Sequence, residues 1–113
     1  IRALNIAETD DFGVLRMVVD RPVEALAALK TGGFVANTTD IVAVEIDDTP
    51  GGLSKILKVL SDADVNVEYM YGFIEKRSNN AIMVFRFESP EKAITILSGA
   101  GIKVINETEV KDL

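Results

Sequence analysis

The chain has 113 residues, of which 48% are hydrophobic and 27% are charged, enough for one folded domain or two very small ones. Twelve basic against eighteen acidic side chains give a net charge of −6, which argues against a surface that binds nucleic acid. The absence of Cys and His excludes disulfides, Cys/His zinc sites and histidine general bases; no apolar run is long enough for a membrane span, and residues 1–4 lack the basic start of a signal peptide. We therefore expect a soluble, cytoplasmic protein without a metal or other cofactor, and with no nucleic-acid or membrane partner.

From residue 41 onward, the spacing of apolar residues predicts four strands and two helices. The strands are expected at residues 41–46, 67–74, 81–87 and 102–105. An amphipathic helix of about four turns is expected from Leu53, and the polar segment 75–80 is expected to form a hairpin loop. A second helix begins with Ser89 as its N-cap and Pro90 in its first turn, and ends at two glycines. This order predicts an α+β, ferredoxin-like βαββαβ unit, an antiparallel sheet with both helices on one face.

The first part of the chain repeats the second half of this unit. Residues 13–36 align with residues 81–104 at a constant offset of 68. The offset matches Pro22 with Pro90, Ala25 with Ala93, Leu29 with Leu97 and Gly33 with Gly101. Residues 1–4 align with residues 67–70 at an offset of 66, and the hairpin loop absorbs the difference. The chain is therefore interpreted as a tandem repeat.

The repeat predicts two units of unequal completeness. Residues 41–113 form a complete unit, whereas residues 1–40 form the back half of a first unit, whose first strand and helix lie before residue 1. The corresponding strand and helix of the second unit imply about 26 residues there. Half a ferredoxin-like unit alone would leave a sheet edge and an apolar face uncovered. We interpret the chain as a fragment of a longer one; the alternative is a permuted or partner-completed domain. The first unit is expected to pair with the second through edge strands or helix faces.

The segment 47–53, between the first complete strand and its helix, is the first candidate site. Thr49 is expected to cap the helix and Pro50 to lie in its first turn, whereas Gly51 and Gly52 are poor helix residues. Glycine would let a ligand approach the backbone, and the first-turn N–H groups would bind a carboxylate. Equally, the glycine pair serves a tight turn and close helix–sheet contact. A Gly52→Val variant is expected to abolish ligand binding and to leave the fold largely intact.

Asn66 is the second candidate, because its amide could donate to a carboxylate or accept from an ammonium group. One helix separates it from the loop at residues 48–52, and we expect both at the same end of the sheet. The alternative is that Asn66 stabilises the turn from helix to strand. Downstream, Tyr69, Tyr71 and Phe73 alternate along one strand and are expected to pack against a helix or a second unit.

The element order, the sequence Asp-Asp-Thr-Pro-Gly-Gly-Leu at residues 47–53 and Asp-Val-Asn-Val-Glu-Tyr at residues 64–69 resemble the ACT domain family. The resemblance covers the whole chain, which is similar to small stand-alone proteins made of two ACT units. It implies a regulatory module that binds an amino acid between two units, the loop after strand one of one unit facing the start of strand two of the other. The ligand-binding residues that it implies are Asp48, Gly51, Gly52, Leu53 and Asn66.

Two functions follow from these observations. The first is a regulatory module that senses a free amino acid, with a homo-oligomer or a regulated enzyme as its expected partner. The second is a structural module that pairs sheets and binds no ligand. Enzyme activity is not expected, because no carboxylate pair or lysine forms a catalytic constellation in a chain without His or Cys.

Overall fold

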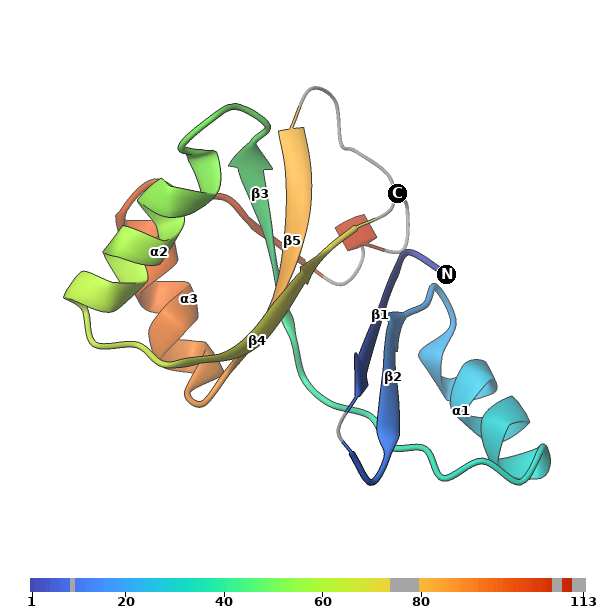
Figure 1. Ribbon diagram of the computed structural model, residues 1–113. Coiled ribbons are helices and arrows are strands. Elements are labelled where there is room, and N and C mark those ends of the chain that lie inside the picture. Colours follow the sequence, from blue (N-terminus) through green and yellow to red (C-terminus); the bar gives the residue numbers. More distant parts are fainter. Residues whose placement is uncertain (9, 74–79, 107–108, 111–113) are drawn as a thin grey trace.

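A computed structural model describes residues 1–8, 10–73, 80–106 and 109–110 of the chain. Figure 1 shows the order of its elements along the chain. The first part contains β1 (Ala3–Glu8), β2 (Gly13–Val18) and α1 (Pro22–Thr31). The second part contains β3 (Val42–Asp47), α2 (Gly52–Asp62), β4 (Val67–Gly72), β5 (Asn80–Phe87), α3 (Pro90–Gly99) and β6 (Val104–Ile105). None of the helices among the described residues is long and apolar enough to cross a membrane.

The second part folds as the pattern of its sequence predicts. Its four strands form one sheet in the order β4-β5-β3-β6, in which every neighbouring pair is antiparallel. Both α2 and α3 cover the same face of this sheet (Figure 1). This arrangement is the expected ferredoxin-like α+β unit. Of the loop expected at residues 75–80, Asn80 instead begins β5. The other five loop residues and the strand position 74 lie outside the described residues.

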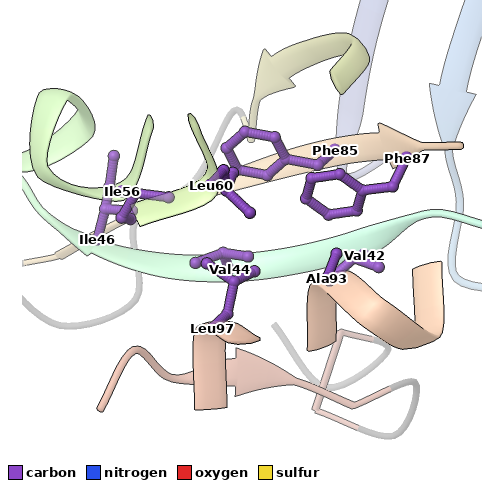
Figure 2. Packing of buried hydrophobic residues seen from close by; sticks show 9 residues of the cluster. All are labelled: Val42, Val44, Ile46, Ile56, Leu60, Phe85, Phe87, Ala93 and Leu97. Carbon is purple, nitrogen blue, oxygen red and sulfur yellow. The ribbon is translucent and has the colours of Figure 1, made fainter. Parts of the chain in front are cut away.

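The core of the second part lies between its sheet and its two helices. β3 and β5 contribute large apolar side chains to this core, and α2 and α3 cover them (Figure 2). Phe85 and Phe87 stack with their ring centroids 5.3 Å apart, and both are fully buried. Leu60 of α2 and Leu97 of α3 are buried against the same cluster. The strict helical spacing of the apolar residues in α2 explains why one side of that helix is in the core.

Two details of the helix ends differ from the prediction. Ser89 stands at the N-cap of α3, but its side chain makes no capping hydrogen bond, and only its carbonyl oxygen accepts the Ala93 N–H, at 3.1 Å. The last strand is shorter than residues 102–105, because the Ile102 N–H donates to the Leu97 carbonyl oxygen at 3.0 Å and so closes α3. Gly101, at a φ of 77°, makes that closure possible.

The repeat extends from the sequence to the backbone hydrogen bonds. Phe34 donates to Leu29 at the end of α1 as Ile102 donates to Leu97 at the end of α3, each at 3.0 Å and at the offset of 68. The hairpins share their register too, since the pair Leu4 and Met17 in β1–β2 corresponds to Met70 and Phe85 in β4–β5. The first part is therefore built like the second half of the second part, as the alignment predicts.

The two parts meet mainly face to face. The inner face of the β1–β2 hairpin lies against the side of the second sheet that carries no helix (Figure 1). Ala3 and Val18 pack there against Tyr71 and Val84. One edge contact also forms, an antiparallel bridge between Ala3 and Phe73. Of the two expected modes, edge strands therefore contribute one bridge. The rest of the seam packs the hairpin against the sheet face, where Val18 also contacts the cluster of Ala43, Ile82, Ile105 and Val110.

Candidate functional site

The loop between β3 and α2 is a tight turn rather than the first turn of the helix. The Gly52 N–H donates to the Thr49 carbonyl oxygen at 3.0 Å, with Pro50 and Gly51 between them. Gly51 has a φ of 89° and a ψ of −6°, so the four residues form a type II turn with Pro at its second position. The prediction that Thr49 caps the helix and Pro50 lies in its first turn is wrong, because the turn delays the helix to Gly52.

Gly52 is required by a close approach between α2 and the end of β3. A Cβ atom at this position would lie less than 3.0 Å from the Asp47 carbonyl oxygen, a separation that real Cβ atoms essentially never show. Both glycines thus have structural reasons to be there, Gly51 for the turn and Gly52 for helix–sheet packing. The expectation that Gly52→Val leaves the fold largely intact is wrong, because the valine side chain would collide with the main chain.

The loop still combines two features that suit a small zwitterion, a carboxylate and main-chain N–H donors. Asp48 is exposed and supplies a carboxylate. The first-turn N–H groups of Leu53 and Ser54 lie at the positive end of the α2 dipole and have no acceptor four residues earlier within the helix. The Leu53 side chain itself packs against the apolar core, so that residue offers its main chain rather than its side chain.

Asn66 does not lie at the end of the sheet where the loop lies. β3 and β4 are both antiparallel to β5, so they run parallel to each other, and Asn66 lies beside the start of β3. The 11-residue helix α2 separates the two positions by about 16 Å. The prediction of a common end is wrong because the chain returns along α2 before it enters β4.

Asn66 lines a cavity of about 280 Å³ at the C-terminal end of α2. The other lining residues are Leu57, Leu60, Ser61, Asp64, Val65 and Val67. The Asn66 side chain is exposed, while its carbonyl oxygen accepts the Glu88 N–H at 3.5 Å. Asp64, at a φ of 57°, supplies the left-handed residue that ends α2. Both the turn interpretation and a binding role are compatible with this position.

The bridge between Ala3 and Phe73 relates each candidate to the other unit. β1 runs antiparallel to β4, so the start of β1 lies near the end of β4, at the end of the sheet where β3 enters the loop. The end of β1 lies correspondingly toward Asn66. The loop at residues 48–53 thus shares its end of the sheet with Arg2 and Ala3, which begin the first unit.

Two arginines, Arg16 and Arg86, make polar contacts that the sequence pattern did not predict. The Arg16 guanidinium lies 3.9 Å from the centroid of the Tyr69 ring, across the seam between the two parts. Arg86 donates from Nε to Glu68 Oε2 at 3.2 Å and from Nη1 to the Asp40 carbonyl oxygen at 2.9 Å. Arg16 alternates with Val14 and Val18 along β2 and so lies on the same face of the strand, which could have indicated that it faces the second unit. Within the described residues, no group of three or more acidic side chains is placed to hold a metal ion.

The aromatic residues of β4 pack against the first unit, which is one of the two predicted alternatives. Tyr69 and Tyr71 stack at 6.4 Å between ring centroids, with 19° between their planes. Tyr71, Phe73 and Tyr69 belong to the cluster that contains Ala3 and Val18. The seam between the parts is therefore aromatic on the side of the second unit.

Alkaline pH is expected to weaken this seam through Tyr71. Burial raises the pKa of its hydroxyl above the ordinary 10.0, the electrostatic interaction with Tyr69 raises it further, and Arg16 partly opposes both effects. The folded state favours the neutral phenol of Tyr71. Its contribution to the free energy of unfolding is therefore fully present below the pKa of the unfolded chain and is lost as pH rises through the pKa of the folded state. Urea unfolding of the parent at about pH 9 and about pH 11 should show the loss. Tyr71→Phe should show a smaller loss, and an equal one would assign the effect to another group.

The fold and the repeat define a tandem pair of ferredoxin-like units, and comparison with known proteins assigns their family. The family model for the ACT domain pair matches residues 1–113, so the chain belongs to the ACT domain family. ACT domains are regulatory modules. The crystal structure of protein BT0572 from Bacteroides thetaiotaomicron is similar, with a TM-score of 0.88 and 37% identity over 98% of this chain and 76% of that chain. No curated protein sequence matches the chain.

Proposed function

We propose that this ACT pair is a sensing module that binds a free amino acid between two units. The observation that carries the proposal is the orientation of the Ala3–Phe73 bridge. It brings the start of β1 to the end of the sheet where the loop of residues 48–53 lies. An inter-unit site has one side from the loop and the other from the start of β1, as the family resemblance implies.

The chemistry of the loop suggests how each end of the ligand is held. The carboxylate is placed at the first-turn N–H groups of α2, where Gly51 and Gly52 present main chain without a side chain and Leu53 supplies a donor. The ammonium group is placed at the Asp48 carboxylate. A second site of the same kind would use the other unit's strand, because β4 corresponds to β1 in the repeat. In that site, Asn66 at the start of β4 would have the role that the start of β1 has in the first site. Ligand binding would then change how the units pack, and a homo-oligomer or a regulated enzyme would respond to that change.

Calorimetric titration of the chain with each of the twenty amino acids tests the proposal. Binding of one or a few of them with a defined stoichiometry is expected. A chain that binds none of them would favour the alternative, a structural module that pairs sheets. The observation that supports this alternative is that a turn and a close packing contact account for both glycines of the loop.

Asp48 and Asn66 are expected to respond differently, because they lie at opposite ends of the sheet. Asp48→Asn should weaken binding of the amino acid found in the screen by about 1.5–3 kcal/mol, since a charged hydrogen bond is lost. Asn66→Ala should leave binding at the loop unchanged. It should weaken binding only at a second site that includes Asn66. Asn37→Ala, in the exposed segment between the units, is the control. Equal weakening by Asp48→Asn and Asn66→Ala would place both residues in one site and contradict the geometry.

A further inference from the structure

Two links between the units end at one pair of residues in the second sheet. The first link is the linker, residues 32–39, which leads to Asp40, whose carbonyl oxygen accepts a hydrogen bond from Arg86 Nη1 at 2.9 Å. The second link is in the seam, where the Arg16 guanidinium of β2 lies 3.9 Å from the centroid of the Tyr69 ring. Tyr69 and Arg86 are direct cross-strand partners in β4 and β5, so their side chains leave the same face of the sheet.

The strand β4 is irregular at this pair. Val67 pairs with Phe87 and Tyr69 pairs with Arg86, so Glu68 is the extra residue of a β-bulge. A bulge bends its strand and redirects the side chains beside it. The Glu68 carboxylate accepts a hydrogen bond from Arg86 Nε at 3.2 Å, and the Arg86 side chain is only 29% exposed. One guanidinium therefore binds the bulge through Nε and the end of the linker through Nη1.

The bulge connects these contacts along the main chain as well. A guanidinium presents its donors in fixed directions, so the position that Arg86 takes on Glu68 also sets its position on the Asp40 carbonyl oxygen. Glu68 directly precedes Tyr69, so the backbone that Arg86 holds at the bulge also orients the Tyr69 ring toward Arg16. Loss of the ion pair would change both links at once.

We propose that the Glu68 bulge couples the two links, so that anchoring of the linker and docking of the first unit occur as one cooperative step. Release of the linker from Arg86 then loosens the contact between Arg16 and Tyr69, and loss of that contact loosens the linker. Such coupling requires a shared structural element, which here is the bulge. The alternative is two links that contribute independently. The proposal does not depend on amino-acid binding.

Tyrosine fluorescence tests the proposal because it reports on the seam alone. The chain has two tyrosines and no tryptophan, and both Tyr69 and Tyr71 belong to the cluster at the seam. Quenching by acrylamide, a neutral molecule, measures the ratio of open to closed seam. Arg16→Gln removes the cation beside Tyr69 and should raise this ratio about threefold. Glu68→Gln, which removes an ion pair inside the second unit, should raise it about twofold.

The double variant distinguishes coupled from independent links. Independent links would multiply the two effects to about sixfold, whereas coupled links should give at most about threefold, because the second substitution removes a contact that the first has already loosened. A double variant at sixfold or above would overturn the proposal. So would a Glu68→Gln protein with the far-ultraviolet circular dichroism and the quenching of the parent.

Asp62→Asn is the matched control for Glu68→Gln. It removes a carboxylate from another exposed ion pair, with Lys58 on α2, and changes the net charge by the same amount. Both residues of that pair lie on a helix that covers the opposite face of the sheet from the hairpin (Figure 1). Quenching in this variant should equal that of the parent. A rise equal to that of Glu68→Gln would assign the effect to net charge and contradict the role of the bulge.

Discussion

A Gly52→Ala substitution is expected to lower the free energy of unfolding by about 3 kcal/mol. The new methyl group would lie against the Asp47 carbonyl oxygen, at a separation that forces either α2 or the end of β3 to move. Neither can move freely, because Asp47 pairs with Asn80 in the sheet and α2 is held by Ile56 and Leu60 in the core. Urea unfolding monitored by circular dichroism measures the change.

Gly99→Ala is the matched control for Gly52→Ala. Gly99 is the last residue of α3, it is exposed, and a Cβ there would meet nothing within 4 Å. Alanine loses less conformational entropy than glycine in a helix, so this variant should be unchanged or more stable by up to about 1 kcal/mol. A Gly52→Ala protein as stable as Gly99→Ala would show that the contact with Asp47 does not restrain the loop.

The second large effect is expected for Leu97→Ala, with Leu29→Ala as its partner in the repeat. Leu97 is fully buried between α3 and the sheet, so truncation should cost about 3–4 kcal/mol from lost burial and the cavity left behind. Leu29 is the same residue type at the same position of α1, yet it remains partly exposed. Its truncation should cost about 1 kcal/mol.

The difference between these two variants measures how incompletely the first unit buries its helix. Denaturant unfolding of both variants beside the parent gives the comparison. Equal costs would mean that Leu29 is buried in solution as fully as Leu97, against its exposure in the structure.

Local patterns were sufficient to predict most of the fold. The apolar runs of β3 and β5, the apolar side of α2 and the Pro90 start of α3 each depend on nearby residues, and the structure has all of these elements within a residue or two. The repeat predicted the first unit because the same side-chain pattern imposes the same register, from Leu4 and Met17 to Met70 and Phe85.

The details of the candidate site depend on geometry that a local pattern does not contain. A Thr-Pro pair before glycine fits either a helix start or a type II turn, and only the position of Asp47 relative to α2 decides between them. Asn66 was placed at the wrong end because proximity was inferred from one intervening helix without following the direction of the chain. The contact between Arg16 and Tyr69 joins two units, so neither strand alone predicts it.

The hydrogen bond from Arg86 to Asp40 shortens the linker between the two units and so sets the affinity that their seam needs to stay closed. Arg86 holds the Asp40 carbonyl oxygen to the second sheet, so only residues 32–39 join the end of α1 to a fixed point. A coil of that length spans about 15 Å, which gives the two units an effective concentration of about 1 mM relative to each other. A seam with a dissociation constant near that value would be closed about half the time. A ligand that contributed about 1.4 kcal/mol to the closed form would therefore shift the pair to about 90% closed.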